Sequence, residues 1–495
     1  MPTTARSKRR TGPKVAMIGA GSVVFAKRLM TDILSWPSLQ GGEIALMDIH
    51  QGRLDMIHAL GTRLVKQEKL PTKITKTTDR RKALDGADYV ISSIQVGGLE
   101  MYEHDVEIPR QYGIDQTVGD TLGPGGVFRG LRTIPVLVSI AKDMEELCPH
   151  ALFINYSNPM NMNMWAVSAS SKIRNAGLCH SVQGTADRLA GFMGVPSEEM
   201  SFWCAGINHQ AWYLELRRGH GGAGGENLYP LLREKMEDPA IFAKDRVRFE
   251  VMRHFGYFVT ESTHHMSEYV PWFRTKPELI EQFTTPRWDY FEICKNRQDP
   301  HYEKMERQAR GEEPVETKRT HEYCSSILNA METNTPYVMN GNVQNMLGRS
   351  TQANGGAGSV LISNLPPNCS VEVPILVDGS GLRPCAVGDL PEACAAINRT
   401  NVNVQALAVE GALTGDREMI HRAVQMDPLT SALLPLSTIR EMVDKLFTAE
   451  AEYLPQFQGS GKGRAARSKG NGRSGANGQA RGSGAAGRGR HRVLA

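Results

Sequence analysis

The sequence predicts an α/β protein that begins with a Rossmann-like doubly wound parallel sheet and continues into a second, helix-rich α+β domain. Two observations support this fold class. Short apolar runs alternate with segments of helical spacing over residues 14–200, and longer, more polar segments with aromatic residues follow. Such alternation is typical of a parallel sheet with helices on both faces. We therefore expect a first domain over 14–200 and a second over 201–457, which a chain of 495 residues can accommodate.

Each expected element rests on a local pattern of apolar residues. The strands are short runs rich in apolar residues, and the helices repeat apolar residues every three or four positions. In the first domain we expect strands over 14–18, 43–47, 74–77, 89–93 and 151–155, and helices over 23–36, 53–66 and 134–146. In the second domain we expect strands near 371–376 and helices over 393–412 and 438–449.

The two ends of the chain differ in composition from the body between them. Residues 1–13 carry four Lys or Arg and residues 458–495 carry nine, without any Asp or Glu. The formal net charge of +4 therefore hides a body with 44 basic and 53 acidic residues, which does not favour nucleic acid or membrane binding. We expect both ends to be disordered, because they cannot bury enough apolar surface. A solubilising tail is the main interpretation, and electrostatic RNA binding is the alternative.

The sequence lacks the marks of an exported or membrane-spanning protein. No segment approaches the roughly 18 apolar residues of a membrane span, and no apolar run follows the first basic residues. The eight cysteines are too sparse for a disulfide scaffold and form no CxxC pair. We therefore expect a cytoplasmic protein whose cysteines are thiols.

A glycine-containing turn follows the first expected strand. Gly19-Ala-Gly-Ser22 precedes a helix, and Asp48 ends the next strand, 27 residues after Gly21. Glycines let the backbone approach a pyrophosphate, and a carboxylate at this place accepts hydrogen bonds from ribose hydroxyls. Val24 replaces the third glycine of the usual pattern, so a tight turn without a ligand is the alternative. The strand–helix context favours dinucleotide binding, and Asp48 favours NAD over NADP.

Two further segments are expected near this turn. Asp120-Thr-Leu-Gly-Pro-Gly-Gly126 precedes a helix and is expected to be a flexible loop, which either closes over ligands or only connects two elements. The fifth strand ends in Asn155-Tyr-Ser-Asn158. Polar side chains after the carboxyl end of a strand face the ligand-binding crevice of doubly wound sheets.

A loop of small residues over 351–359 is expected in the second domain.

Cysteine and histidine residues form a possible metal site. Cys179 and His180 are adjacent, and His209 follows thirty residues after Cys179. A thiolate and an imidazole suit a borderline-soft divalent ion, but the spacing matches no zinc finger, and a buried thiol beside a hydrogen-bonded histidine is the commoner outcome. Residues 264–272 also concentrate histidines and aromatic residues, and an aromatic corner of the core would have the same spacing.

From Lys14 to about Gln456 the sequence resembles the NAD- and manganese-dependent glycosidases of glycoside hydrolase family 4, and most closely their α-galactosidase branch. The resemblance rests on motifs spread over nearly the whole body: Ile18-Gly-Ala-Gly-Ser22, Leu46-Met-Asp48-Ile, Asp120-Thr-Leu-Gly-Pro-Gly-Gly126, Asn158-Pro-Met160, Gly177-Leu-Cys-His-Ser-Val-Gln-Gly-Thr185, Ala205-Gly-Ile-Asn-His209, Glu268-Tyr-Val-Pro-Trp272, Gly341-Asn-Val343 and Asn364-Leu-Pro366.

The resemblance implies a redox-assisted hydrolysis. In this family NAD⁺ takes a hydride from C3 of the sugar, a base removes the C2 proton, the leaving group departs from C1, water adds, and the hydride returns. This is the NAD-dependent exception to the two-carboxylate scheme of other glycosidases. The family also implies Mn²⁺ as a Lewis acid at the C2 and C3 oxygens, and a homodimer or homotetramer.

The resemblance also implies residue roles. Cys179 and His209 are the expected metal ligands, although softness alone would suggest zinc for such a pair. Tyr269 is the expected C2 base and requires a pKa lowered by the metal or by cations, and His180 is expected to assist leaving-group departure as an acid. Substrate hydroxyls are expected to contact Asn158 and Gln95. The residues expected to bind NAD are Gly19, Gly21, Ser22, Asp48 and Arg53.

Other functions remain open at this point. The segment over 346–360 and the tail over 458–495 depart from the family pattern, so an α-galacturonidase or α-glucosidase of the same family is an alternative. A second alternative is an NAD-dependent oxidoreductase of the malate/lactate dehydrogenase type, whose two-domain architecture the predicted fold shares. The motifs at Cys179 and His209 have no role in that chemistry. The third alternative is RNA or partner binding through the basic tail.

Overall fold

The computed structural model describes residues 12–22, 25–219, 224–320, 322–346 and 360–458. The described body forms one compact unit that ends at Gln458. The predictions of disorder at the two ends fall almost entirely outside the described residues, and so does the predicted small-residue loop over 351–359.

The body is built on a single mixed sheet of twelve strands. Its order is β3-β2-β1-β4-β5-β6-β10-β11-β7-β8-β9, and β12 also pairs with β11. The strands are β1 (Lys14–Ile18), β2 (Glu43–Met47), β3 (Lys73–Thr77), β4 (Tyr89–Ser92), β5 (Leu152–Asn155), β6 (Arg174–Gly177), β7 (Met200–Ile207), β8 (Gln210–Arg218), β9 (Glu226–Asn227), β10 (Tyr337–Gln344), β11 (Ser370–Asp378) and β12 (Gly381–Pro384).

The first six strands are parallel, in the order of a doubly wound nucleotide-binding sheet. Alternate residues of β1, β2, β4 and β5 enter different cores. Val15 and Met17 pack in the core that includes the first two helices, whereas Ala16 and Ile18 pack in the core on the other face. This near-continuous apolar pattern is expected for strands covered on both faces. The helices of this part are α1 (Ala26–Leu34), α2 (Gln51–Gln67), α3 (Arg80–Leu84), α4 (Gly98–Gln111), α5 (Gly123–Leu147), α6 (Met160–Ser170) and α7 (Ser181–Met193).

The second part continues the sheet with antiparallel strands. The parallel part joins the antiparallel part where Asn342 of β10 pairs with Gly177 of β6, and β11 joins the β7–β8 hairpin where Glu372 pairs with Gly206. The helices of this part are α8 (Tyr229–Met236), α9 (Pro239–Phe242), α10 (Arg246–Phe255), α11 (Thr263–Met266), α12 (Pro277–Thr284), α13 (Tyr290–Arg310), α14 (Cys324–Thr333), α15 (Glu392–Thr414), α16 (Arg417–Gln425), α17 (Pro428–Leu433) and α18 (Leu436–Ala449).

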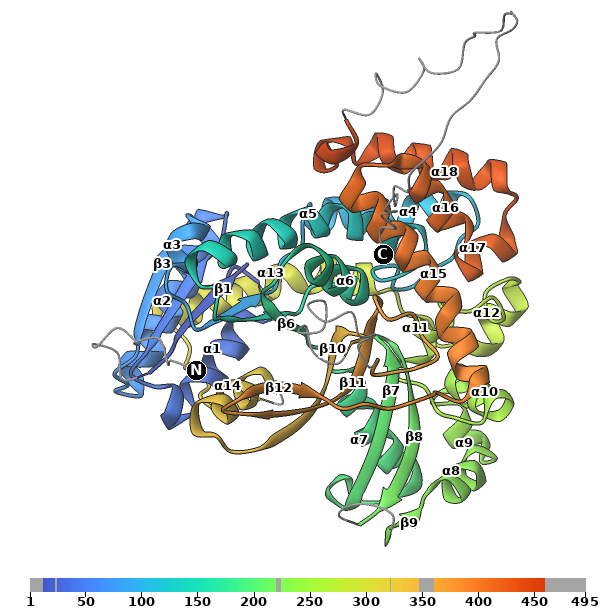
Figure 1. The fold of residues 1–495 in the computed structure, drawn as a ribbon, viewed down its shortest axis with the longest axis horizontal. Helices are drawn as coiled ribbons and strands as arrows, with labels where there is room; N and C mark the ends of the chain where they lie inside the picture. Colours follow the sequence, from blue (N-terminus) through green and yellow to red (C-terminus); the bar gives the residue numbers. More distant parts are fainter. Residues whose placement is uncertain (1–11, 23–24, 220–223, 321, 347–359, 459–495) are drawn as a thin grey trace, which may run out of the picture. The chain divides into compact units, whose positions relative to one another are not determined.

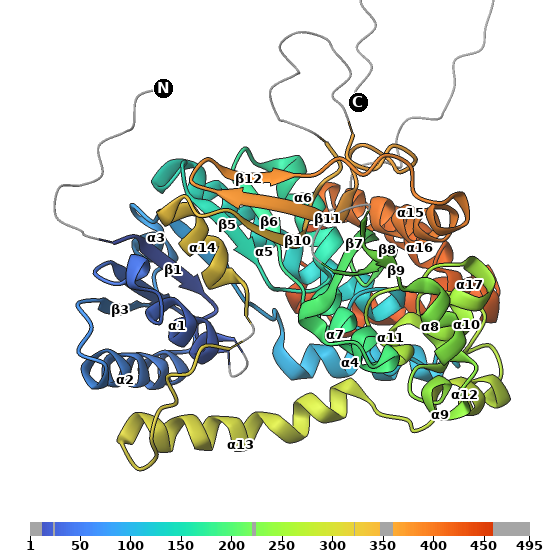
Figure 2. The same ribbon diagram turned by 90° about the horizontal axis from the view of Figure 1, so that it is seen from below.

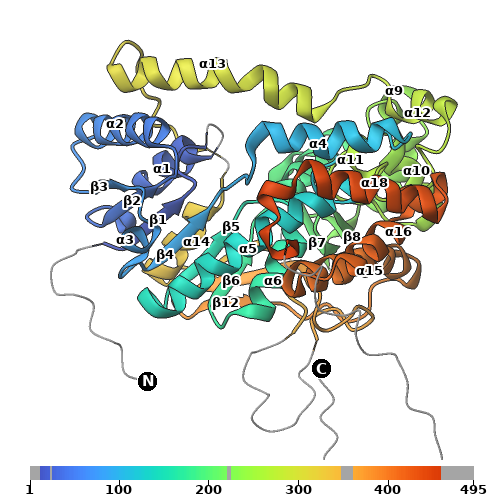
Figure 3. The same ribbon diagram turned by 90° about the horizontal axis from the view of Figure 1, so that it is seen from above.

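Several helices of the second part return to the first. The helices α15, α16 and α18 gather beside α4 and α5 (Figure 1). The long helix α13 lies along α2 and α4, as Figures 2 and 3 show from opposite sides. It ends at Gly311, whose left-handed backbone (φ 93°) is a common helix terminator. Residues distant in the sequence therefore surround the parallel strands.

The predicted fold class is confirmed, and every predicted strand and helix corresponds to an observed element. Their ends agree within a few residues, except that α5 begins at Gly123, well before the predicted start at residue 134. The sequence interpretation missed β6, the β7–β8 hairpin and β10. One sheet crosses the predicted boundary near residue 200, and the division into two domains stays a prediction. Among the described residues, no helix is long and apolar enough to cross a bilayer.

Candidate active site

The predicted site residues follow the carboxyl ends of parallel strands. Gly19 follows β1, Asp48 follows β2, Asn158 follows β5 and Cys179 follows β6. Parallel strands bring such positions to one edge of the sheet, where doubly wound proteins bind ligands. The fold thus gathers residues that are up to 160 positions apart in the sequence.

The turn after β1 leaves no room for side chains. Gly19 has φ 81°, and a Cβ atom there would lie 2.6 Å from the carbonyl oxygen of Ser93. A Cβ atom on Gly21 would lie 2.8 Å from Oδ2 of Asp48. The same Asp48 oxygen accepts a 2.8 Å hydrogen bond from the Gly21 amide, which fixes the turn to the end of β2. A cradle that only glycine can form fits a dinucleotide whose phosphates approach the backbone.

The other predicted NAD residues surround this turn. Ser22 Oγ accepts a hydrogen bond from the Phe25 amide at 3.3 Å, ahead of α1. The guanidinium of Arg53 lies over the ring of Tyr302, 4.7 Å from its centre, and the Tyr302 hydroxyl donates to the Gly21 carbonyl at 3.1 Å. Tyr302 belongs to α13, 281 residues after Gly21, and no local sequence signal pointed to it.

The predicted substrate-contacting residues differ in their surroundings. Asn158 donates through Nδ2 to Oδ2 of the buried Asp120 at 3.2 Å, so it is connected to the rest of the site. Gln95 donates through Nε2 to the Gly98 carbonyl at 3.0 Å, a contact within its own loop. The structure therefore links Asn158 to other candidate site residues, and it gives no such link for Gln95.

Cys179, His209 and Glu261 form a group with the composition of a metal site. Their ligand atoms all lie within 4.8 Å of one another. Cys179 Sγ lies 3.2 Å from His209 Nε2. Cys179 comes from the end of β6, His209 from the turn between β7 and β8, and Glu261 from the segment between α10 and α11. The sequence interpretation found the first two and missed Glu261, because no spacing connects it with them.

The electrostatics of the pair suit metal binding. Burial alone would raise the pKa of Cys179, but His209 outweighs it and the pKa is lowered. Burial opposes a charge on His209, yet the Cys179 thiolate raises the pKa of His209 to about 10. Each side chain therefore favours the charged form of the other, as in a thiolate–imidazolium pair. A thiolate is the form of cysteine that binds metal ions, and the donor set of sulfur, nitrogen and oxygen fits a divalent transition metal.

Tyr269 lies on the other side of the His209 ring. Its hydroxyl oxygen is 3.1 Å from His209 Nδ1 and 3.2 Å from His265 Nε2. His265 Nε2 is itself 2.8 Å from His209 Nδ1. Burial, together with the carboxylate of Asp120, raises the pKa of the Tyr269 hydroxyl well above its usual value. The chain by itself therefore does not supply the lowered pKa that a catalytic base requires, and that expectation stays a prediction for the loaded enzyme.

His180 faces a buried carboxylate. Its Nε2 atom lies 2.6 Å from Oε2 of Glu322, and the imidazole is half-exposed while Glu322 is buried. The next residue, Tyr323, both accepts a hydrogen bond from the Cys179 amide at 2.8 Å and donates one to the Cys179 carbonyl at 2.6 Å. The segment before α14 thus fixes the backbone of Cys179 and the side chain of His180 together. Neither Glu322 nor Tyr323 carried a sequence signal.

The segment over 120–126 differs from the expectation of a flexible loop. Helix α5 already begins at Gly123, and all seven residues are buried. A Cβ atom on Gly125 would lie 2.2 Å from the Asp105 carbonyl oxygen. The glycines therefore permit close packing of α5 against α4. The preceding backbone is held by Glu268, which accepts hydrogen bonds from the amides of residues 117–119.

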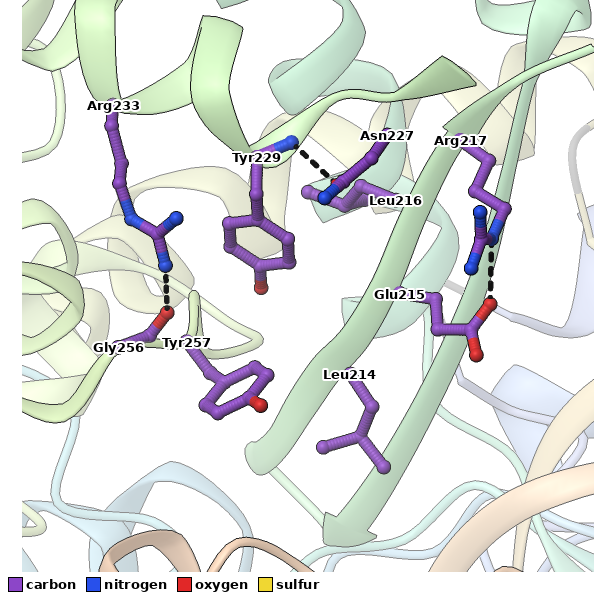
Figure 4. Close-up of a pocket in the computed structure, with 9 residues that line it drawn as sticks. All are labelled: Leu214, Glu215, Leu216, Arg217, Asn227, Tyr229, Arg233, Gly256 and Tyr257. Carbon is purple, nitrogen blue, oxygen red and sulfur yellow. Dashed lines mark hydrogen bonds and ion pairs between the residues drawn. The ribbon is translucent and has the colours of Figure 1, made fainter. Parts of the chain in front are cut away.

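A separate pocket lies between β8, β9 and α8 (Figure 4). Arg233 at its edge donates to the Gly256 carbonyl at 3.1 Å, and Arg217 pairs with Glu215 at 2.8 Å. None of the predicted site residues lines this pocket. Its arginines already have partners within the chain, so the candidate chemistry stays with the Cys179 group.

Comparison with known proteins identifies the family. The family 4 glycosyl hydrolase model matches residues 14–195, and the model of its C-terminal domain matches residues 204–430. The chain therefore belongs to family 4 of the glycosyl hydrolases, which confirms the resemblance predicted from its motifs.

Relatives within the family include α-galactosidases. The chain is 40% identical to an α-galactosidase of Rhizobium meliloti (strain 1021) over 456 residues, which covers 90% of this chain and 89% of the relative. It is 41% identical to an α-galactosidase of Bacillus subtilis (strain 168) over 449 residues, which covers 90% of this chain and all of the relative.

Solved structures share the fold. A putative glucosidase from Bacillus subtilis superposes with a TM-score of 0.76 at 25% identity, covering 88% of this chain and 99% of that chain. A 6-phospho-α-glucosidase from gut microorganisms, solved in complex with NAD and Mn²⁺, superposes with a TM-score of 0.74 at 19% identity, covering 90% and 99%.

Proposed function

We propose that this family 4 enzyme is an α-galactosidase that uses NAD and Mn²⁺. The observation that carries the proposal is that the His209 ring lies within hydrogen-bond distance of both Cys179 and Tyr269. This group lies at the same sheet edge as the glycine turn after β1. The α-galactosidases at 40% and 41% identity support the substrate class. The glycine cradle fits NAD, and the thiolate–imidazole pair fits a divalent metal.

The chain's own residues would share the work as follows. When bound, NAD supplies a reversible hydride acceptor for C3 of the sugar, and Mn²⁺ supplies a Lewis acid for the C2 and C3 oxygens. Cys179 and His209 hold the metal, and the glycine turn with Asp48 and Arg53 holds the dinucleotide. Asn158 and Gln95 orient the sugar through its hydroxyls.

Proton movement falls to two side chains. Tyr269 removes the C2 proton through its hydroxyl oxygen, which requires the positive charge of the bound groups to offset the effects of burial and of Asp120 on its pKa. His180 gives a proton to the departing oxygen at C1. Its half-exposed imidazole suits contact with a leaving group, and Glu322 holds the ring in one orientation.

The test is hydrolysis of p-nitrophenyl α-galactoside with controlled cofactors. Activity is expected to require NAD⁺, Mn²⁺ and a reductant that keeps Cys179 a thiol, and galactose formed in D₂O is expected to carry deuterium at C2. Full activity after removal of both NAD⁺ and Mn²⁺ would overturn the proposal. A panel of other α- and β-glycosides, including galacturonides and glucosides, checks the substrate class.

An oxidoreductase of the malate/lactate dehydrogenase type is separated by the same assay. A glycosidase returns its hydride in each turnover, so absorbance at about 340 nm stays flat, whereas a dehydrogenase accumulates NADH. The cytoplasmic location and the homodimeric or homotetrameric state stay part of the proposal. The location is supported by the eight cysteines, all of which are free thiols in the structure, because thiols persist in reducing compartments.

A further inference from the structure

We infer that Glu261 is a third protein ligand of the metal and that its carboxylate raises the affinity of the site for manganese relative to zinc. This inference rests on the proposed metal site at Cys179 and His209. It concerns a residue that neither the motifs nor the spacing of the sequence singled out.

Geometry places Glu261 with the two expected ligands. One ligand atom from each of Cys179, His209 and Glu261 lies within 4.8 Å of the others, which is close enough for a single ion to contact all three. Cys179 and Glu261 are both partly buried, and His209 is buried. Two of the three residues therefore retain some exposure to solvent.

The carboxylate of Glu261 is uncommitted. Among the described residues, no hydrogen bond or ion pair to its carboxylate oxygens is found, although its backbone carbonyl accepts a 3.4 Å hydrogen bond from Thr185. A partly buried carboxylate that faces a thiolate is unfavourable unless a cation lies between them.

The backbone of Glu261 is strained. Four non-glycine residues of the described body have positive φ, and two of them are His209 (62°) and Glu261 (81°). Asn334 ends α14, Lys69 follows α2 and His209 lies in the two-residue turn of the β7–β8 hairpin, all ordinary places for such a conformation. Glu261 directly precedes Ser262, the N-cap of α11, and none of these ordinary settings accounts for its conformation. Strain of this kind is concentrated at ligand-binding positions, where the surrounding structure holds a side chain toward its target.

A carboxylate changes the metal preference of the site. Cysteine and histidine alone are soft or borderline ligands that favour zinc, whereas manganese(II) prefers oxygen ligands. One thiolate and one carboxylate also balance the charge of a divalent ion. Glu261 therefore shifts the relative affinity of the site toward manganese, although its other two ligands suit zinc.

The first experiment measures metal affinity directly. Metal-free enzyme with NAD⁺ bound is titrated with Mn²⁺, and free Mn²⁺ is followed by its electron paramagnetic resonance signal. Substitution of second-sphere partners already costs about 10- to 100-fold in affinity, so Glu261→Gln is expected to weaken Mn²⁺ binding by about 100-fold. Zinc binding is expected to weaken less, so the ratio of Mn²⁺ to Zn²⁺ affinity falls.

Glu215→Gln is the matched control, because Glu215 is an exposed glutamate on β8, the strand that begins beside His209. It is expected to bind Mn²⁺ like the unmodified enzyme. Equal Mn²⁺ affinity of Glu261→Gln and the unmodified enzyme would overturn the inference while leaving the proposed metal site intact. Absence of Mn²⁺ binding by the unmodified enzyme would overturn both.

A second variant separates ligand loss from misfolding. Glycine adopts φ 81° without strain, so Glu261→Gly is expected to leave the Tm of the metal-free protein unchanged or about 1 °C higher. The rise in Tm that Mn²⁺ gives the unmodified enzyme is expected to shrink in this variant. A full Mn²⁺-dependent rise would contradict the ligand role of Glu261. A lower metal-free Tm would contradict the strain on which the inference partly rests.

Discussion

The glycine turn after β1 and the Cys179–His209–Glu261 group lie at the same edge of the sheet but are built differently. The turn uses backbone: its shape depends on two glycines and on one carboxylate 27 residues away. The metal group uses side chains from three segments that span more than 80 residues, and one of these residues, Glu261, has a strained backbone. Local sequence therefore specifies the first region, whereas the second exists only once the whole body has folded.

The two regions also differ in what a substitution should change. A larger side chain in the glycine turn fills the space for the dinucleotide and weakens its binding, but it does not change the ionisable groups. A substitution in the metal group removes a charged ligand and the catalytic role that depends on it. A substitution in one region should therefore leave ligand binding at the other region nearly unchanged.

Cys179→Ser should have the largest effect. Loss of the thiolate removes the anion that pairs with His209, and the variant should lose Mn²⁺ binding. A metal acting as a Lewis acid contributes several kcal/mol to transition-state stabilisation, so we expect kcat/KM to fall by about 10⁴-fold. NAD⁺ affinity, measured by fluorescence titration, should change by less than about threefold if the two regions act separately. Near-native turnover would remove Cys179 from the proposed site.

Tyr269→Phe should come next. The hydroxyl lies 3.1 Å from His209 Nδ1, and its removal takes away the proposed C2 base. Loss of a general base costs 10²- to 10⁴-fold, and we expect kcat to fall by about 10³-fold. Deuterium exchange at C2 should slow in parallel, while Mn²⁺ affinity stays within a few fold. Exchange at the normal rate would assign the base to another group.

Gly21→Ala tests the glycine turn. Its Cβ atom would lie 2.8 Å from Asp48 Oδ2, so the turn must shift. Overpacking of this kind costs about 1–3 kcal/mol, and we expect the Kd for NAD⁺ to rise by roughly 10- to 100-fold. The Mn²⁺ affinity should stay unchanged. Cys179→Ser should give the opposite result, with Mn²⁺ binding lost and NAD⁺ affinity nearly unchanged. Gly184→Ala, on α7 with open space around it, is the control.

The pH dependence of metal binding should give the smallest effect. The pKa of His209 is raised to about 10 in the metal-free protein, but the metal binds only the neutral imidazole. Below that pKa, binding releases a proton, so Mn²⁺ affinity should rise about tenfold per pH unit between pH 7 and 9. Calorimetry in two buffers of different ionisation enthalpy should detect about one proton released. A flat affinity over this range would contradict the thiolate–imidazolium pair.

The limits of sequence interpretation follow the same division. Gly19, Gly21 and Asp48 could be assigned because a strand, a turn and a second strand follow one another in a recognisable order. Cys179 and His209 were assigned through the family resemblance, since spacing alone favoured an unliganded cysteine and histidine. Glu261, Glu322 and Tyr302 were missed because each reaches the site only through tertiary packing.

The helices show the same limit in another form. The segment 120–126, which includes the first turn of α5, contains four glycines or prolines and was expected to be a flexible loop, as such a composition is typical of loops. It is instead buried, because the missing side chains allow α5 to approach the backbone at Asp105. The composition correctly indicated small side chains. Whether small side chains make a segment mobile or allow close packing is determined by the rest of the fold.

The junctions of the sheet have a mechanical consequence. At the first junction Gly177 pairs with β10, and Cys179 follows two residues later. At the second junction Gly206 pairs with β11, and His209 follows three residues later. The proposed NAD site after β1 and the proposed metal site at Cys179 and His209 would then share one rigid frame of hydrogen-bonded strands. This frame lies within a body that forms a single compact unit. Hydride transfer tolerates little error in distance. An enzyme built this way would keep its alignment through both hydride steps without hinge rotation, and its substrates would enter and leave through movements of loops and side chains alone.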